Sequence, residues 1–285
     1  MIPYSFGGNK ARKARYFFHE IDRSGCNYIV TYGSSSSNHC RVIANMAACR
    51  NLSCDIISPQ ENFENTYNSQ MMRLFGANFI TCPVSKVSET IQSRLRELKD
   101  RGYSPYFIQG GGHGNLGTQA YVDCYQEIIR FEEENHFKFD YIFHASGTGT
   151  TQAGLVCGKL ICQGKHKIIG ISIARKNPYG RNVVIDSIKE YLSEYHLTFL
   201  NDKVDDNVIF IDTYTGDGYG KINSEILSSI TNMIIFQGIP MDSTYTAKAY
   251  YGMTKYLRDN NIEGKNILFI HTGGTPLFFD DLSKL

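Results

Sequence analysis

The chain has 285 residues and a mass of 32.2 kDa, which is long enough for about two domains or one large α/β unit. Its 29 Lys and Arg residues almost balance its 28 Asp and Glu residues, so the formal net charge is +1. A chain with so little net charge has no overall field that attracts nucleic acid, lipid headgroups or acidic partners. These figures exclude binding to polymers through bulk charge, and we expect neither a nucleic-acid nor a membrane partner.

The eight cysteines form no Cys-x-x-Cys pair and lie in segments that are predicted to be strands and helices. We therefore interpret them as reduced thiols of the core rather than as a disulfide or zinc framework, and we expect no metal. The first residues do not have the basic and apolar segments of a secretory signal, and no stretch approaches the ~18 apolar residues of a membrane span. We expect a cytoplasmic protein.

Short apolar runs alternate with helical patterns along the whole chain, which is typical of βαβ units and parallel sheets. The predicted strands are Tyr28–Tyr32, Cys54–Ser58, Phe79–Cys82, Tyr106–Gln109, Tyr141–Ala145, Ile168–Ile173, Val208–Asp212 and Ile267–His271. The predicted helices are Asn9–Asp22, Asn38–Arg50, Ser69–Phe75, Glu89–Lys99, Thr118–Glu134, Thr151–Gln163, Asn182–Tyr195, Lys221–Gln237 and Thr246–Asp259. We expect two doubly wound parallel layers, with the charged stretches Glu132–Glu134 and Asp202–Asp206 as solvated helix ends or loops.

The polar stretch Glu132–Lys138 is the best compositional marker of a domain boundary. After it, the strand Tyr141–Ala145 starts a second series of strands and helices. In such folds a ligand binds outside the carboxyl ends of the strands, so we expect it between the two halves.

The sharpest local signal is Ser146-Gly147-Thr148-Gly149-Thr150-Thr151, which lies between a predicted strand and a predicted helix. Backbone N–H groups and threonine hydroxyls converge there on a helix N-terminus, and glycines allow an anion to approach closely. The loop is not a Walker loop, because no Gly-Lys-Ser/Thr ends it, and Gln152 replaces the third glycine of a dinucleotide fingerprint. We interpret it as a phosphate cradle, with an ordinary glycine-rich turn as the alternative.

A second signal is the segment Gly7-Gly8-Asn9-Lys10-Ala11-Arg12-Lys13. Partial desolvation and the neighbouring cations can lower the pKa of the Lys10 amine and favour a Schiff base. On these residues alone, an exposed lysine in a basic first turn is the favoured interpretation.

Ser37, Asn38 and His39 also lie between a strand and a helix. Ser37 or Asn38 suits the N-cap, and the N–H groups behind it can receive a carboxylate. Capping alone would explain both residues, and the role of His39 stays open. Further clusters at 109–114, 215–220, 242–248 and 271–276 suggest a site assembled from many strand ends.

Taken in order, these segments resemble the pyridoxal-phosphate enzymes of the tryptophan-synthase-β fold that comprise D-cysteine desulfhydrase and 1-aminocyclopropane-1-carboxylate deaminase. The matching blocks are Gly-Gly-Asn-Lys-Ala-Arg-Lys at 7–13, Ser-Asn-His at 37–39, the 146–151 loop with the following Gln-Ala-Gly-Leu, Tyr-Thr-Ala-Lys-Ala at 245–249, and Phe-Ile-His-Thr-Gly-Gly at 269–274. Five blocks in the right order outweigh any single loop. The resemblance implies an α/β fold of two doubly wound parallel-sheet domains with pyridoxal phosphate in the cleft between them. It also implies a homodimer.

The same resemblance implies the domain limits and the role of each site residue. Residues 1–22 and 136–285 would form the larger cofactor-binding domain, with 23–135 as a smaller inserted domain. Lys10 resembles the lysine that holds the cofactor as a Schiff base and then moves the proton at the substrate Cα. The remaining site residues are Asn38 on the cofactor's phenolic oxygen, Ser37 and His39 on the substrate carboxylate, Gly147, Thr148, Gly149, Thr150 and Thr151 on the phosphate, and Tyr219 and Tyr245 beside the ring, acting on substrate or leaving group.

Thr246 helps to choose the reaction within the family. It occupies the place that contacts the pyridine nitrogen, where the cyclopropane deaminases resemble one another in having glutamate. A carboxylate keeps that nitrogen protonated, whereas a neutral hydroxyl favours the unprotonated ring, which is adequate for expelling a good β-leaving group. We therefore expect α,β-elimination on a small β-substituted amino acid, as in D-cysteine desulfhydrase, giving pyruvate and ammonia.

Several alternatives remain at this stage. A deaminase that opens the cyclopropane ring and a β-replacement enzyme share the same fold and cofactor. A protein that binds the cofactor or substrate with little turnover, dependent on a partner, is a third. A nucleotide-binding module is disfavoured, because no acidic residue is placed for a ribose and the other blocks would have no explanation.

Overall fold

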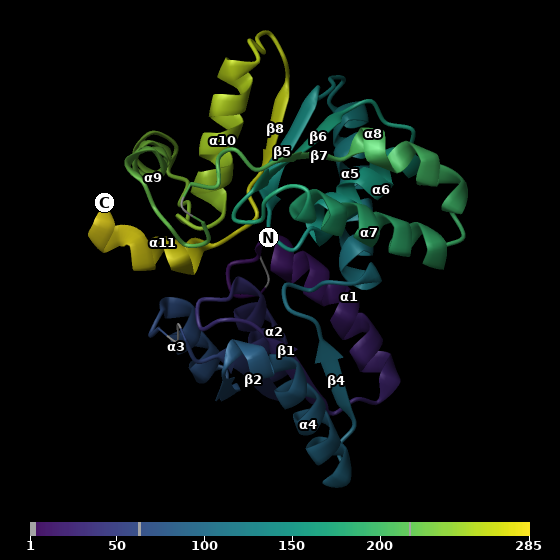
Figure 1. Ribbon diagram of the computed structural model, residues 1–285, viewed down its shortest axis with the longest axis vertical. Helices are drawn as coiled ribbons and strands as arrows, with labels where there is room; N and C mark the ends of the chain where they lie inside the picture. The colour runs from purple at the N-terminus through teal and green to yellow at the C-terminus, as the bar shows by residue number, and fades with distance from the viewer. Residues whose placement is uncertain (1–3, 62–63, 217) are drawn as a thin grey trace. The chain divides into compact units, whose positions relative to one another are not determined.

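The computed structural model describes residues 4–61, 64–216 and 218–285. The chain forms two compact units, the first ending at His113 and the second starting at Gly114. Each unit contains a four-stranded parallel sheet with helices packed against it (Figure 1).

The sheet of the first unit has the strand order β3-β2-β1-β4. Its strands are β1 (Tyr28–Tyr32), β2 (Ser53–Pro59), β3 (Asn78–Cys82) and β4 (Pro105–Ile108). Its helices are α1 (Gly8–Ser24), α2 (Asn38–Ala48), α3 (Tyr67–Leu74), the 3₁₀ turn η1 (Val84–Lys86) and α4 (Val87–Asp100). The middle residues of β1 and β2 are buried on both faces, and most of them are apolar. The buried Asp55 of β2 is an exception that pairs with Arg94 at 2.6 Å.

The sheet of the second unit has the order β7-β6-β5-β8. Its strands are β5 (Tyr141–Ser146), β6 (Lys167–Ser172), β7 (Ile209–Ile211) and β8 (Ile267–Ile270). Its helices are α5 (Asn115–Glu134), α6 (Thr150–Ile161), α7 (Tyr179–Glu194), η2 (Thr198–Lys203), α8 (Val204–Asn207), α9 (Ser224–Gln237), α10 (Thr246–Asp259), α11 (Thr275–Asp281) and η3 (Leu282–Lys284). Every residue of β5 is buried, so the loop that follows it starts from a fixed strand end.

Two glycines of α6 allow it to approach α5 closely. A Cβ on Gly154 would lie 2.3 Å from the carbonyl oxygen of Thr118, and one on Gly158 would lie 2.5 Å from Cβ of Tyr125. Real Cβ atoms do not approach other atoms so closely, so both positions require glycine. These glycines therefore serve the contact between helices that orients the start of α6.

The predicted α/β fold with two parallel sheets is confirmed, and all eight predicted strands are present within one or two residues of their expected bounds. The stretch Asp202–Asp206 ends η2 and begins α8 with exposed acidic side chains, as predicted. The prediction that Glu132–Glu134 is solvated is wrong for Glu132, which is buried and accepts the backbone N–H of Phe139 at 2.7 Å. The segment after Gly274 forms α11, which is not among the predicted helices. The two compact units place α1 with the first sheet, whereas the resemblance assigns residues 1–22 to the larger domain, so those functional domain limits stay a prediction.

All eight cysteines are unpaired. The prediction that they lie in the core is wrong for Cys49 and Cys162, which are exposed. Within the described ranges, none of the helices combines the length and the apolar character that crossing a membrane requires.

Candidate active site

Lys10 lies in the first turn of α1, in the first unit. The chain enters this helix through Gly7 and Gly8, whose φ angles of 64° and 79° favour glycine. The Lys10 Nζ donates a hydrogen bond to the carbonyl oxygen of Gly111 at 3.0 Å. Burial lowers the pKa of this amine from its ordinary 10.5 to about 8. Lys10 is therefore poised to act as a neutral nucleophile or base close to neutral pH.

Lys13 is a second buried amine on the same face of α1. It lies three residues after Lys10, and a Cβ on Gly112 would lie 3.3 Å from its Cδ. Burial lowers its pKa well below the ordinary value, and the charge of Lys10 lowers it further. The sequence alone treats Lys13 only as a neighbouring charge, although the spacing of three residues could have placed it beside Lys10.

Ser37 is the N-cap of α2, as the sequence predicts. Its hydroxyl oxygen accepts a hydrogen bond from the backbone N–H of Cys40 at 3.2 Å. A Cβ on Gly33 would lie 2.7 Å from Cys40 Sγ and 2.9 Å from Ser37 Oγ, so the chain turns tightly into the helix. The N-terminus of α2 thus presents backbone N–H groups and a positive dipole end that suit a carboxylate.

Asn38, the first residue of α2, is held by two polar side chains. Its Oδ1 accepts from Arg41 Nη1 at 2.5 Å and from Asn68 Nδ2 at 3.1 Å. Both of these hydrogen bonds to described residues use its oxygen, which leaves the N–H groups of the amide to a ligand. The sequence gives no sign of Asn68, because this residue belongs to α3.

His39 is buried and holds a fixed tautomer. Its Nε2 lies 2.9 Å from the hydroxyl of Thr31, which donates its own proton to the carbonyl oxygen of Ile108 at 2.8 Å. His39 Nε2 must therefore be the donor, and Nδ1 has no hydrogen-bond partner within the described part of the chain. Burial and the charges of Lys10 and Lys13 hold the His39 pKa well below its usual range, so the ring is neutral.

The predicted phosphate loop begins the second unit's site, between β5 and α6. Gly149, with φ of 95°, is the N-cap of α6 and accepts the backbone N–H of Ala153 at 2.9 Å. The loop is anchored by Arg175 Nη1, which donates to the Thr148 carbonyl at 3.2 Å, and by the Ile173 N–H on the Ser146 carbonyl at 3.1 Å. A fixed loop at the N-terminus of a twelve-residue helix is suited to hold an anion.

Gln152 explains why this loop is not a dinucleotide fingerprint. Its side chain is buried, accepts the Ser146 hydroxyl at 3.1 Å and donates to the Ile209 carbonyl of β7 at 2.7 Å. A Cβ on Gly170 would lie 2.1 Å from Gln152 Oε1. Gln152 is thus a brace between the loop and two neighbouring strands rather than a residue that opens room for a second phosphate.

The two predicted tyrosines meet in the second unit. The hydroxyls of Tyr219 and Tyr245 are 2.5 Å apart, and their rings pack edge to face at 6.0 Å. Buried Lys248 stabilises the segment that precedes Tyr219, because its Nζ donates to the carbonyls of Thr215 and Gly218 at 3.0 and 2.7 Å. The same amine donates to the Ile173 carbonyl at 3.2 Å, which links this turn to the segment that anchors the phosphate loop.

Thr246 is fully buried at the start of α10, and its hydroxyl bonds to Asp242. It donates to Asp242 Oδ1 at 2.8 Å and accepts from the Asp242 N–H at 2.9 Å. The Asp242 carboxylate also accepts the backbone N–H groups of residues 244, 245 and 246. Contact between Thr246 and a pyridine nitrogen stays a prediction, and Asp242 is a structural residue that the sequence did not reveal.

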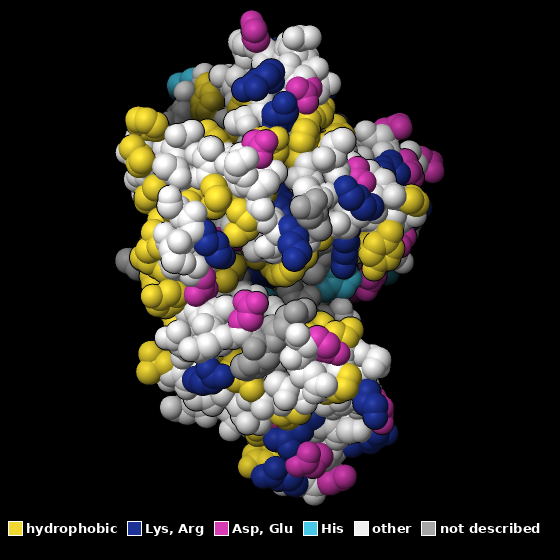
Figure 2. All heavy atoms as spheres, turned by 60° about the vertical axis from the view of Figure 1, so that its left-hand side comes forward, with side chains coloured by type: hydrophobic (Ala, Val, Ile, Leu, Met, Phe, Trp, Pro, Cys, Tyr) yellow, Lys and Arg dark blue, Asp and Glu magenta, His cyan; other side chains and the backbone are white. Residues whose placement is uncertain are grey.

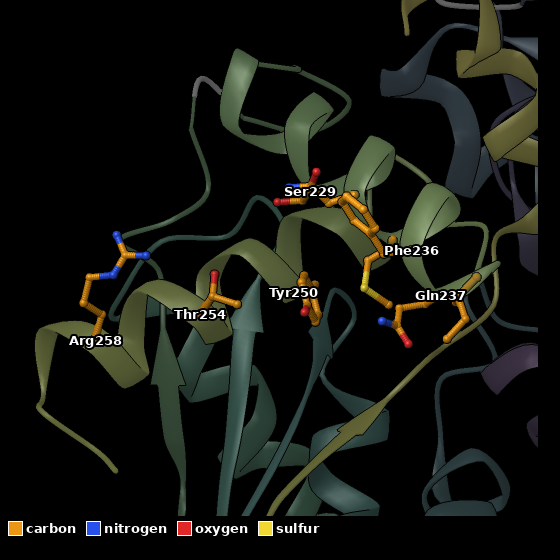
Figure 3. Close-up of a pocket in the computed structure, with 9 residues that line it drawn as sticks. Ser229, Phe236, Gln237, Tyr250, Thr254 and Arg258 are labelled. Atoms are coloured by element: carbon orange, nitrogen blue, oxygen red, sulfur yellow. The ribbon is translucent and has the colours of Figure 1, made fainter.

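A groove of about 560 Å³ lies between α9 and α10 (Figure 3), and none of the predicted site residues lines it. Ser229, Phe236 and Gln237 of α9 face Tyr250, Thr254 and Arg258 of α10 there. On the face shown in Figure 2, basic and acidic side chains are interspersed rather than gathered, in agreement with the charge balance.

A lysine with a lowered pKa and a glycine-rich helix N-terminus are the parts by which a protein binds a phosphorylated aldehyde. Residues 3–273 match the family described as "pyridoxal-phosphate dependent enzyme". The chain belongs to this family of enzymes, and pyridoxal phosphate is its cofactor.

Within that family, the chain is similar to proteins named D-cysteine desulfhydrase. The one from Yersinia enterocolitica is 30% identical over 287 residues, covering 98% of this chain and 86% of the relative. The one from Serratia proteamaculans is 29% identical over 290 residues, with the same two shares covered. A crystal structure of an "ACC deaminase homologue" superposes with a TM-score of 0.86 at 31% identity, covering 98% of this chain and 83% of that one.

Proposed function

We propose that this protein is a lyase that catalyses α,β-elimination on a small β-substituted amino acid, with D-cysteine as the first candidate substrate. The observation that carries the proposal is the Lys10 amine, whose pKa burial lowers to about 8. Support for the substrate class comes from the relatives named D-cysteine desulfhydrase, which share about 30% of the sequence over nearly the whole chain.

Each of the two units contains residues that fit pyridoxal phosphate. Lys10 would hold its aldehyde carbon covalently, and the N–H groups of Asn38 would donate to its phenolic oxygen. Gly147, Thr148, Gly149, Thr150 and Thr151 would hold its phosphate at the N-terminus of α6. When bound, pyridoxal phosphate supplies the electron sink that stabilises negative charge at the substrate Cα.

Lys10 would also move the proton. The neutral Lys10 amine would take the proton from the substrate Cα. A pKa of about 8 makes a substantial share of this amine neutral near neutral pH, whereas an ordinary lysine would be almost fully charged.

Two further groups would orient the substrate and help the leaving group. The Ser37 hydroxyl and the backbone N–H of His39, at the N-terminus of α2, would receive the carboxylate. The paired hydroxyls of Tyr219 and Tyr245 would give a proton to the departing thiolate. The sum of the reaction is D-cysteine plus water giving hydrogen sulfide, pyruvate and ammonia.

Thr246 favours elimination over ring opening in this proposal. Thr246 stands where a cyclopropane deaminase would have a glutamate, and its hydroxyl gives its proton to Asp242, so it cannot protonate the pyridine nitrogen as a carboxylic acid would; a thiolate also leaves more easily than a ring carbon. Ring opening and β-replacement are the competing reactions.

The test is turnover by the enzyme loaded with pyridoxal phosphate. We expect pyruvate from D-cysteine, β-chloroalanine or O-acetylserine, and sulfide from D-cysteine. Lys10→Ala should abolish both, whereas the exposed control Lys203→Ala should not. No pyruvate from any of the three, with cofactor bound, would refute the lyase. 2-Oxobutanoate from 1-aminocyclopropane-1-carboxylate would instead assign ring opening.

We further propose that the protein works as a homodimer in the cytoplasm. Ile235 and Phe236 of α9 are 67% and 73% exposed beside the α9–α10 groove, which supports an apolar interface there. The unpaired state of the eight cysteines supports a reducing compartment. Sedimentation should give a dimer that Phe236→Glu weakens; a wild-type monomer would contradict the proposal.

A further inference from the structure

The start of α3 is hydrogen-bonded to the loop that precedes α2. The Thr66 hydroxyl donates to the Ser35 carbonyl at 3.0 Å, and the Glu64 N–H donates to the Ser35 hydroxyl oxygen at 3.0 Å. A capping box between Thr66 and Ser69 fixes the start of the helix. This arrangement holds Asn68, which is fully buried, against the start of α2.

The hydrogen bonds around Arg41 determine the orientation of two amides. Arg41 Nη1 donates to Asn38 Oδ1 at 2.5 Å and to Asn68 Oδ1 at 2.6 Å. A guanidinium nitrogen can only donate, so the oxygen of each amide must face Arg41. The oxygen and nitrogen of these two amides are thereby distinguished by chemistry.

The hydrogen bonds made by the amide nitrogen of Asn68 agree with that orientation. Its Nδ2 donates to the Ser36 carbonyl at 2.7 Å and to Asn38 Oδ1 at 3.1 Å. Turning the Asn38 amide over would place its N–H groups against N–H groups of both Arg41 and Asn68. The buried network therefore has one satisfied arrangement, and turning over either amide breaks it.

This network limits the atoms that Asn38 can bind. Its oxygen already accepts two hydrogen bonds, one of them from a cation, so only its Nδ2 remains for a ligand. Nδ2 offers donors only, which restricts the atom bound there to a hydrogen-bond acceptor. A charged guanidinium behind the oxygen also polarises the amide and strengthens it as a donor.

We infer that Asn68, together with Arg41, is a positioning residue that keeps the N–H groups of Asn38 directed at an oxygen acceptor of the bound cofactor. The acceptor is the phenolic oxygen of pyridoxal phosphate, so the inference rests on the placement of Asn38 in the proposed function. Asn68 acts through Asn38 and touches no reacting atom.

The test uses Asn68→Asp, which keeps the shape of the side chain and its bond to Arg41. It removes the donor to Ser36 and Asn38 and places a carboxylate oxygen against Asn38 Oδ1, so the Asn38 amide is displaced from the orientation that directs its N–H groups at the cofactor. We expect the dissociation constant of pyridoxal phosphate to rise about tenfold, the loss of one charge-assisted hydrogen bond. The pH midpoint of the bound cofactor's visible absorbance should rise by about one unit, since its phenolate loses a donor.

Two comparisons separate positioning from general damage. Asn65→Asp makes the same chemical change on an exposed residue of the same segment and should leave both quantities unchanged. In an Asn38→Ala background, Asn68→Asp should have no further effect on either, because its target is absent. If Asn68→Asp shows no cooperative unfolding transition, the smaller polar variant Asn68→Ser replaces it in the same cycle.

Equal cofactor binding and equal absorbance titrations for the Asn68→Asp and Asn65→Asp variants would overturn the inference. So would an undiminished effect of Asn68→Asp in the Asn38→Ala background. Both readouts need bound cofactor but no turnover. A wild-type protein that binds pyridoxal phosphate and yields no pyruvate would therefore refute the lyase while the cycle still decides the role of Asn68.

Discussion

The lowered pKa of Lys10 makes a quantitative prediction about its reactivity. With a pKa of about 8, some 9% of the amine is neutral at pH 7, whereas the ordinary value of 10.5 leaves about 0.03%. Lys10 should therefore present roughly 300 times more nucleophilic amine at pH 7 than an ordinary lysine. The physical cause is burial of the amine beside the Gly111 carbonyl, which disfavours its charged form.

Competitive acetylation of the cofactor-free protein between pH 6 and 11, followed by peptide mass spectrometry, measures this directly. Exposed Lys203 is the internal reference. The extent of labelling at Lys10 should rise with a midpoint near pH 8. Cys40→Ala should leave that midpoint in place, because burial raises the Cys40 pKa to about 12 and the thiol is uncharged at pH 8. A Lys10 midpoint above pH 10 would refute the reasoning.

Three further predictions concern stability. Asp242→Ala leaves four donors at the start of α10 without their acceptor. Urea denaturation should show that the free energy of unfolding falls by about 3–5 kcal/mol, and a fall below about 1 kcal/mol would contradict this. His39 has its folded pKa below the unfolded value of about 6.5, so its stabilising contribution is present above that pH and is lost below it. The free energy of unfolding should therefore fall as the pH drops through about 6.5, a slope that His39→Gln should lack; equal pH profiles of the two proteins would disprove this. Gly158→Ala places a Cβ 2.5 Å from that of Tyr125 and should cost about 2 kcal/mol or more by the same denaturation assay; unchanged stability would show that α5 and α6 can separate freely.

The fold could be predicted from the sequence because its signals are local. The strand Tyr141–Ser146 begins with three apolar residues, and the glycine loop after it marks the turn into α6. The shortest helices were not predicted, because a few residues carry too little local signal. The seven residues of α11 are too few to show a helical period, and Pro276 near its start resembles a turn signal as much as a helix start.

The candidate site was predictable only where its residues lie in sequence blocks. Ser37, Asn38 and Lys10 are such residues, whereas Asn68 reaches Asn38 from 30 positions away and no local pattern marks it. The state of Thr246 also escaped prediction. The sequence gives no sign of a partner for its hydroxyl. In the structure this hydroxyl donates its proton to the Asp242 carboxylate and accepts the Asp242 N–H.

The central claim is that Lys10 holds pyridoxal phosphate covalently. The most direct measurement is to incubate the purified protein with the cofactor, reduce it with borohydride and locate the pyridoxyl group by peptide mass spectrometry. The account predicts a stoichiometric label on Lys10, together with loss of the visible absorbance in Lys10→Ala. A label on another buried amine such as Lys13 or Lys248, or no label at all, would contradict it.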